Sequence, residues 1–240
     1  MKILTFEEFT EAFDVIDGKL ELNAETGIPS KFGKGKKLTP FKKTLEDTRI
    51  TVYSLYQAKD ETETLKAIKS ADMQSDEMRK FLSRSAIYAS RVIRPEKIDV
   101  VVTPQSSSIL NSEIAQEIRK RIRADFFIDS FKKVNTSKIE VNKDHPKITP
   151  DIIKSMEKTL ERTKRNGFFT VKAFAVLHRK FLKNFFELTD DRLMKKVDGK
   201  TVLIMDDIVT SGATLEEIVK TLYAHGAEKV VGLTIFKSAR

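Results

Sequence analysis

Three apolar runs in the second half of the chain constrain its fold more than any other feature. They span residues 98–103, 201–205 and 230–236, and each is of strand length without alternation of apolar and polar residues. Such runs are typical of strands that are buried on both faces of a sheet. Helical patterns separate them, and residues 126–128 form a shorter fourth run. This order predicts an α/β fold with a doubly wound, mostly parallel sheet.

Residues 1–95 predict an additional α+β region before that sheet. Thr5 and Glu8 have the spacing of a capping box, and the helical pattern behind them continues through Phe13. Residues 27–40 hold three glycines and two prolines among lysines, which predicts a loop.

A strand and a long helix complete this N-terminal region. Residues 50–56 are rich in β-branched and aromatic residues and predict a strand. Ser75 precedes an amphipathic pattern that Pro95 ends, which predicts a helix capped by Ser75. We therefore divide the chain into an N-terminal accessory or hood region, residues 1–95, and a core domain, residues 96–240.

One connection within the core domain is much longer than the others. Residues 131–170 separate two strands, are rich in basic side chains, and show a helical pattern from 150 to 164. A connection of this length inside a compact α/β domain is usually a functional lid or an inserted subdomain. We therefore expect an inserted helical lid here.

Composition narrows the chemistry and the setting. The chain has no cysteine, which excludes disulfides, thiolate zinc sites and thiol nucleophiles. It has neither a signal-peptide pattern nor an apolar run near the roughly 18 residues of a membrane span, so we expect a cytoplasmic protein without a membrane partner. The formal net charge of +9 favours anionic partners, nucleic acid among them, although a solvated basic surface is the plain alternative.

The strongest functional signal follows the strand at residues 201–205. Asp206 and Asp207 come next, and residues 208–214 then form a turn with hydroxyl side chains and one glycine that leads into a helix. Backbone N–H groups, hydroxyls and a helix N-terminus together hold a phosphate dianion. Gly212 lets the backbone approach that dianion closely. Two carboxylates repel phosphate, so we expect the acidic pair to face sugar hydroxyls or a magnesium ion.

The chain contains its own comparison for this acidic pair. Asp190 and Asp191 also follow an apolar stretch, but no glycine loop comes after them. We interpret this second pair as part of a helix start that Thr189 caps. A strand end and a capped helix are the alternative for Asp206 and Asp207 too, but there the strand, acidic pair, hydroxyl-glycine loop and amphipathic helix occur together.

Residues 202–215 resemble the phosphoribosyl pyrophosphate motif of type I phosphoribosyltransferases. That motif is four apolar residues, two acids, two variable residues, Thr-Thr/Ser-Gly, one variable residue and Thr, and every position fits. The resemblance implies that Asp206 and Asp207 contact the ribose hydroxyls of the donor in a catalytic role. It also implies that its 5′-phosphate is held by Thr210, Ser211, Gly212, Ala213 and Thr214.

A weaker match follows the first strand of the core domain, where this family places a pyrophosphate-binding loop. Gln105, Ser106 and Ser107 occupy that place, and serine hydroxyls can donate to phosphate oxygens. Many members of the family carry an arginine or lysine in this loop, whereas residues 104–108 have none. The alternative is a flexible serine-rich turn.

A third match points to the ComF-like branch of the family. Residues 110–115 resemble its F-N-Q-x-x-L-A stretch, and residues 132–138 and 162–169 resemble its K/R-x-x-x-T and R-x-x-N-x-x-x-F landmarks. The cysteine cluster that many ComF-like proteins carry at the N-terminus is absent, so residues 1–95 are not that zinc module.

The basic residues of the long connection have two interpretations. Members of the family often place a lysine that meets the pyrophosphate after the second core strand, where this chain has Lys132 and Lys133. Arg162, Lys164 and Arg165 would then close over the pyrophosphate and neutralise it as it leaves. A solvated helix face is the alternative.

The resemblance implies an enzyme that transfers ribose 5-phosphate from phosphoribosyl pyrophosphate to a nucleobase or amine and releases pyrophosphate. It implies Mg²⁺ as a cofactor, held by the substrate rather than by direct protein ligands. The acceptor is chosen in this fold by a variable hood, which here comes from residues 1–95, from the insert, or from both. The alternative function is a non-catalytic phosphoribosyl pyrophosphate sensor or a nucleic-acid-binding protein on the same fold, and a homodimer stays open in either case.

Overall fold

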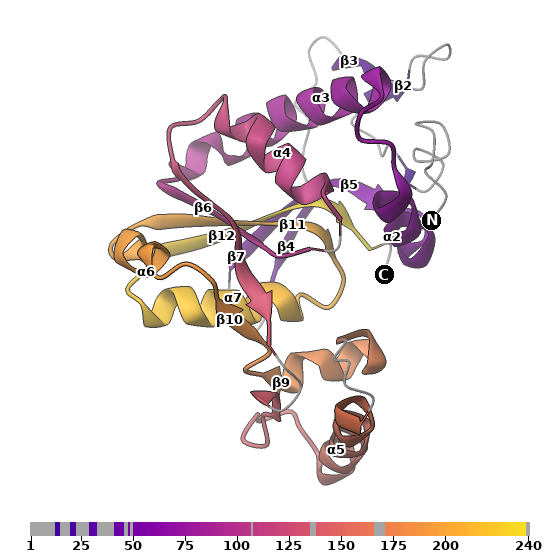
Figure 1. Ribbon diagram of the computed structural model, residues 1–240, viewed down its shortest axis with the longest axis vertical. Helices are drawn as coiled ribbons and strands as arrows, with labels where there is room; N and C mark the ends of the chain where they lie inside the picture. Colours follow the sequence, from indigo (N-terminus) through magenta and orange to yellow (C-terminus); the bar gives the residue numbers. More distant parts are fainter. Residues whose placement is uncertain are drawn as a thin grey trace.

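Figure 1 shows the computed structural model of the chain. It describes residues 13–14, 20–22, 29–32, 41–45, 48, 50–106, 108–134, 138–165 and 171–238.

The centre of the described structure is an eight-stranded sheet in the order β1-β5-β12-β11-β6-β7-β10, with β4 also pairing with β5. The central strands β5, β12, β11, β6 and β7 run parallel, whereas β1, β4 and β10 are antiparallel to their neighbours. The bounds are β1 Phe13–Asp14, β4 Phe41–Thr44, β5 Thr51–Ala58, β6 Val100–Pro104, β7 Asp125–Lys133, β10 Phe186–Leu188, β11 Thr201–Val209 and β12 Lys229–Lys237.

Two short antiparallel pairs lie outside this sheet, β2 (Leu20–Leu22) with β3 (Pro29–Phe32) and β8 (Glu140–Val141) with β9 (Leu182–Lys183). Among the described residues, no helix is long and apolar enough to cross a bilayer. The helices are α2 Glu61–Ser70, α3 Asp76–Ile93, α4 Leu110–Arg119, α5 Pro150–Arg165, α6 Arg192–Val197 and α7 Ala213–Ala224, with 3-10 turns η1 Arg94–Glu96, η3 Val171–Ala173 and η4 Val176–Phe181.

Helices cover both faces of the sheet (Figure 1). Helices α3 and α4 lie on one face, in the same apolar core as Leu203 of β11 and Val231 of β12. Helices α6 and α7 lie on the other face, where Leu193 and Ile218 share a second core with Val202. Successive residues of β11 therefore point into two different cores, which explains why its sequence is apolar without alternation.

The predicted doubly wound, mostly parallel sheet is confirmed. Helix α3 begins as predicted, where Oγ of Ser75 accepts a hydrogen bond from the backbone N–H of Met78 over 3.2 Å. Two strands are longer than predicted, since β11 continues through the acidic pair to Val209 and β7 continues to Lys133. Their polar ends remain in the sheet because the backbone of a neighbouring strand still pairs with them.

The N-terminal region does not separate from the core domain at residue 95. Strand β5 pairs in parallel with β12, and Met78 and Phe81 of α3 belong to the core on the α4 face. The expected division at that residue therefore coincides with no break in the sheet.

Two local expectations for the N-terminal region need correction. Phe13 lies in strand β1 and not in a helix, because its backbone pairs with that of Ala58 in β5. The loop expected at residues 27–40 contains strand β3, which pairs with β2. The capping box of Thr5 and Glu8 lies outside the described residues.

The long connection forms a small body of its own, which Figure 1 shows beyond α7 and away from the sheet. Helix α5 confirms the predicted helical segment. The insert is longer than the expected residues 131–170, because its apolar cluster continues as far as Phe185. Ala213 at the start of α7 belongs to the same cluster and connects the insert to the sheet domain. The buried members of this cluster, called the insert core below, are Val134, Ile139, Val141, Met156, Leu160, Phe174, Phe181, Leu182, Phe185 and Ala213.

Candidate functional site

Asp206 and Asp207 lie near the carboxyl end of β11, at the sheet edge where open α/β folds bind ligands. The backbone N–H of Asp207 donates to Oδ1 of Asp206 over 2.9 Å. Oγ of Ser106, in the loop after β6, donates to Oδ2 of Asp207 over 3.3 Å. The sheet thus brings the acidic pair and the serine loop together across 101 positions of the sequence.

Burial raises the pKa of Asp206 well above its usual range, and the charge of Asp207 raises this pKa further. Lys133 at the end of β7 acts in the opposite direction and lowers the pKa of Asp206 by its positive charge. Asp206 therefore holds a proton more readily than a free aspartate does, and a cation placed beside the pair would relieve the repulsion.

The turn between β11 and α7 runs from Thr210 to the first residues of a 12-residue helix. Gly212 precedes the helix with φ of 86°, a left-handed conformation that favours glycine. Oγ of Ser211 accepts from the backbone N–H of Ala213 over 3.4 Å, and the side chain of Ala213 packs into the insert core. Thr214 is half-buried in the first turn of the helix. The turn thus combines a glycine, hydroxyls and a helix N-terminus, as an anion site requires.

The sequence suggested that Gly212 lets the backbone approach a phosphate dianion, but the structure shows a further reason for glycine at this position. A Cβ at this position would lie 2.6 Å from Cδ2 of Leu45, the residue that follows β4. Leu45 is buried in the core on the α7 face. The positive φ and the close approach of Leu45 both call for glycine here, whatever a ligand requires.

The serine loop is fixed at both ends. The backbone N–H of Gln105 donates to a carbonyl of β7 over 2.7 Å. Ser108 is buried, and its Oγ donates to the backbone carbonyl of Ile68 in α2 over 3.4 Å. Ser107 lies outside the described residues. Ser108 therefore connects the loop to the N-terminal region, whereas Ser106 faces the acidic pair.

Lys132 and Lys133 end β7 and act on different partners. Nζ of Lys132 lies 3.7 Å from Oε1 of Glu187, its register partner on β10. Lys133 acts on Asp206 instead. The pairing of β6 with β7 shifts register just before these lysines, in a stretch where Asp129 has φ of 53°. Lys133 is thus the lysine whose charge acts on Asp206, whereas Lys132 lies beside Glu187.

The comparison pair behaves as a helix start, but not through Thr189. Oδ1 of Asp190 accepts from the backbone N–H of Arg192 over 3.0 Å, and the Arg192 guanidinium lies 2.7 Å from Oδ2. Oγ1 of Thr189 donates to the carbonyl of Asp129 over 2.9 Å. The predicted cap by Thr189 is therefore wrong, and Asp190 holds the first turn of α6.

Asn111 lies near the site, and sequence reasoning assigned it no function beyond its place in the stretch that resembles ComF-like proteins. It is buried in the first turn of α4, and its Nδ2 donates over 3.0 Å to the carbonyl of Met205, directly before the acidic pair. Its Oδ1 is buried without a hydrogen-bond partner among the described residues. Asn111 thus fixes the backbone that delivers Asp206.

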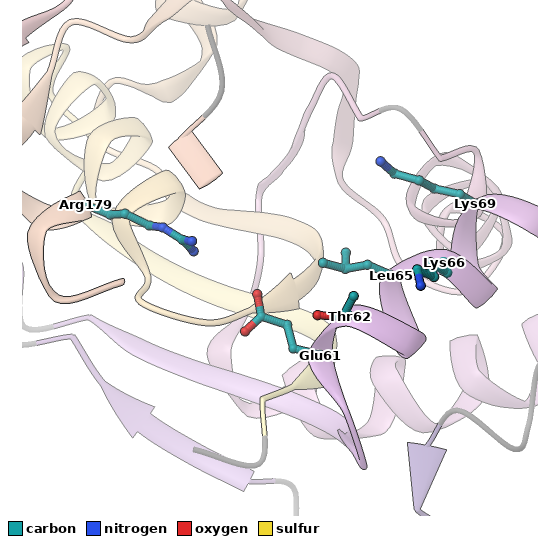
Figure 2. A pocket seen from close by; sticks show the side chains of 6 residues that line it. All are labelled: Glu61, Thr62, Leu65, Lys66, Lys69 and Arg179. Atoms are coloured by element: carbon teal, nitrogen blue, oxygen red, sulfur yellow. The ribbon is translucent and has the colours of Figure 1, made fainter. Parts of the chain in front are cut away.

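A cleft of about 320 Å³ lies between α2 and η4, and sequence reasoning did not find it. Figure 2 shows Arg179 reaching into it from one side and Glu61 and Lys69 from the other. Arg162, Lys164 and Arg165 do not line it; they are in the last turn of α5. The lining residues are Glu61, Thr62, Leu65, Lys66, Lys69 and Arg179.

The acidic pair fits a magnesium ion only with help from a ligand. Asp206 and Asp207 offer the oxygen donors that Mg²⁺ prefers. Within the described ranges, no group of three or more metal-binding side chains comes together. Mg²⁺ takes six ligands in a near-octahedral arrangement, so most positions would fall to water or substrate oxygens. The residues present therefore fit a metal that arrives with its substrate.

The family model described as "Phosphoribosyl transferase domain" matches residues 74–239, more than half of the chain. A ribose-phosphate pyrophosphokinase from Sulfurisphaera tokodaii is 26% identical over 100 residues, which are 38% of this chain and 34% of that protein. The chain thus matches about a third of the length of this curated relative.

The solved structures that resemble part of this chain include two named as phosphoribosyltransferases. A hypoxanthine phosphoribosyltransferase from Staphylococcus aureus has 14% identity and a TM-score of 0.36, with 65% of this chain and 62% of that chain covered. A purine phosphoribosyltransferase from Pyrococcus horikoshii has 12% identity and a TM-score of 0.35, with 65% and 82% covered.

Proposed function

The chain belongs to the phosphoribosyl transferase domain family, and we propose that it transfers ribose 5-phosphate from phosphoribosyl pyrophosphate to a nitrogenous acceptor, a nucleobase or an amine. One observation carries the proposal. The acidic pair, the serine loop and the glycine turn before α7 meet at the carboxyl edge of one parallel sheet, with Ser106 bonded to Asp207. These are the parts that a phosphorylated sugar with a second anionic group needs.

Each part of the donor has a proposed partner. The 5′-phosphate lies in the turn from Thr210 to Thr214, where backbone N–H groups and the N-terminus of α7 favour an anion. The ribose hydroxyls donate to Asp206 and Asp207. The pyrophosphate lies towards Ser106 and Lys133, with Gln105 of the serine loop beside it. Lys132 is a weaker candidate for this role, because it lies beside the carboxylate of Glu187, which it shares with Lys138.

The reaction joins C1 of the ribose to a nitrogen of the acceptor. The C1–O bond to pyrophosphate breaks, its electron pair leaves with the pyrophosphate, and the acceptor nitrogen loses a proton. Positive charge develops on the ribose ring in between, and the carboxylates of Asp206 and Asp207 favour it. Lys133 and the hydroxyl of Ser106 favour the charge that develops on the leaving group.

Mg²⁺, when bound, would neutralise pyrophosphate oxygens and so make pyrophosphate a better leaving group. Asp206 and Asp207 would hold its water shell or the ribose hydroxyls that chelate it. This arrangement would stabilise the ionised form of Asp206, which burial and the charge of Asp207 otherwise disfavour.

A direct test uses purified protein, phosphoribosyl pyrophosphate, Mg²⁺ and a panel of purine, pyrimidine and pyridine bases and amines. The readout is pyrophosphate release that depends on the acceptor. Calorimetry with the donor alone runs beside it. Donor binding without turnover on any acceptor would contradict the enzyme and leave a binding protein.

The second candidate function is non-catalytic. The chain would then be either a sensor of phosphoribosyl pyrophosphate or a nucleic-acid-binding protein on the same fold. The serine loop has no basic residue, and Lys132 is paired with Glu187, so the proposed pyrophosphate end holds less positive charge than the sequence suggested. The calorimetry and turnover measurements separate the two functions. Binding of an oligonucleotide that phosphoribosyl pyrophosphate does not displace would favour the nucleic-acid variant.

A further inference from the structure

The cleft between α2 and η4 has more positive than negative charge in its lining. The lining holds three basic residues, Lys66, Lys69 and Arg179, and one acid, Glu61. Burial lowers the pKa of Arg179, and the charge of Glu61 raises it again, so the guanidinium is partly desolvated beside one acid. An anion bound in this space would stabilise the charged guanidinium and so replace part of the solvation that it has lost.

Both walls of the cleft are attached to the candidate site. Helix α2 follows β5 at the carboxyl edge of the sheet, and its Ile68 accepts a hydrogen bond from Ser108 of the serine loop. On the other wall, Nε of Arg179 donates to the carbonyl of Phe174 over 3.1 Å, and Phe174 shares the insert core with Ala213 of the glycine turn. Each wall is thus fixed to one of the two loops that the donor would contact.

The cleft is lined by both parts of the chain from which a hood could come. Helix α2 comes from the N-terminal region and η4 from the insert, so both parts contribute a wall. Neither wall contains a residue that the donor needs in the proposal above. A cleft that the donor does not occupy is available to a second substrate, and the charges of its lining bear on the chemistry of that substrate.

We propose that this cleft binds the acceptor and that the acceptor carries an anionic group, a carboxylate or a phosphate. Arg179 binds that group from the η4 side of the cleft, and Lys66 and Lys69 add positive charge on the α2 side (Figure 2). Leu65 offers an apolar wall for the body of the acceptor, and Glu61 accepts from one of its N–H groups. This inference rests on the proposed transferase function and adds the substrate class to it.

Inorganic phosphate is the probe for the first test. The protein is saturated with phosphoribosyl pyrophosphate and Mg²⁺, so that the donor's own anion sites are filled, and phosphate is titrated against thermal unfolding at constant ionic strength. We expect a further rise in Tm that saturates with phosphate. Loss of one charge-assisted hydrogen bond should raise the apparent Kd for phosphate about tenfold in Arg179→Gln.

Three further variants separate charge from structure. Arg179→Lys keeps the charge and loses the bond to Phe174, so it should retain most of the phosphate response. Glu61→Gln removes the only acid of the cleft lining and should tighten phosphate. Lys195→Gln is the control, because Lys195 is an exposed residue of α6, which precedes β11 and so lies at the opposite edge of the sheet.

The second test uses two matched pairs of acceptor probes, nicotinate with nicotinamide and orotate with uracil. The acid of at least one pair should stabilise the donor-saturated protein more than its neutral partner, and Arg179→Gln should remove that difference. Three outcomes would overturn the inference. They are the absence of a phosphate response that depends on Arg179, equal binding of acids and neutral partners, and a loss of donor affinity in Arg179→Gln. Failure of the donor to stabilise the wild-type chain would instead overturn the proposed function, since the part of the phosphate response that Arg179→Gln removes can still be measured without the donor.

Discussion

Replacing Gly212 by alanine tests whether the turn before α7 is held by backbone conformation and by Leu45, as the structure indicates. A residue with a Cβ at φ of 86° costs about 1–2 kcal/mol in the left-handed region. The new Cβ would also lie 2.6 Å from Cδ2 of Leu45, which must move away. Because this atom is at the end of a flexible side chain, a change of rotamer at about 0.5–1.5 kcal/mol can relieve the contact. The two contributions sum to about 1.5–3.5 kcal/mol of lost stability.

Gly199 provides the matched control for this variant. It also has a positive φ, 63°, but a Cβ there would meet no atom within 4 Å. Gly199→Ala should therefore lose only the conformational part, about 1–2 kcal/mol. In a chain of 240 residues each kcal/mol lowers Tm by roughly 2–4 °C, so the two variants should differ by a few degrees.

Unfolding in urea and by heat measures both variants, and the Leu45→Ala background isolates the contact. In that background Gly212→Ala should lose no more stability than Gly199→Ala does, because the atom that its Cβ meets is gone. Donor affinity is measured on the same proteins by calorimetry. Equal losses for Gly212→Ala and Gly199→Ala in the wild-type background would refute the role of Leu45. Full donor affinity in a folded Gly212→Ala protein would refute the placement of the 5′-phosphate at this turn.

Four further predictions concern the charged groups of the site and the insert. Asp206→Asn with Asp207→Asn should abolish pyrophosphate release with little loss of stability; parent-rate turnover in the double variant would remove these residues from the mechanism. Because the pKa of Asp206 is raised in the folded state, its contribution to stability is lost as pH rises through that pKa, so Asp206→Asn alone should match the wild-type Tm near pH 3 and exceed it at pH 7. Lys133→Gln should weaken donor binding by several-fold and Lys132→Gln should not, and the opposite order measured by calorimetry would show that β7 presents the other lysine to the ligand. Trypsin should cut the ligand-free protein near residues 138–147 or 162–165 and much less with donor and Mg²⁺, whereas protection by an oligonucleotide alone would speak against a lid over the donor.

Much of the sheet could be predicted from the sequence because its signals are local. The run around Val202 is apolar on both faces, and this pattern indicates a parallel strand without knowledge of its neighbours. Ser75 starts a helix because its own hydroxyl reaches an N–H three residues ahead. The acidic pair and the glycine turn are likewise adjacent in sequence, so their shared position at the strand end followed from one segment.

The parts that could not be predicted depend on contacts between distant segments. Alternation along β7 does not tell which of Lys132 and Lys133 acts on Asp206. The register shift near Asp129 changes the side of the sheet to which the later side chains of β7 point. The cleft required both α2 and η4, which are more than a hundred residues apart, to be placed in space. The membership of β5 in the sheet was also unreadable, since a strand pattern does not name its partner.

The two acidic pairs of this chain show why position decides function here. Asp190 and Asp206 each begin an Asp-Asp dipeptide. Hydrogen bonds from Arg192 hold the pKa of Asp190 below its usual range, so its ionised form is favoured and it serves the start of α6. Burial and a neighbouring carboxylate raise the pKa of Asp206, so its ionised form is disfavoured in the folded chain. A carboxylate that weakens the fold at neutral pH is not explained by the fold, and it is the arrangement expected where a cation or a ring of hydroxyl donors completes the site on binding.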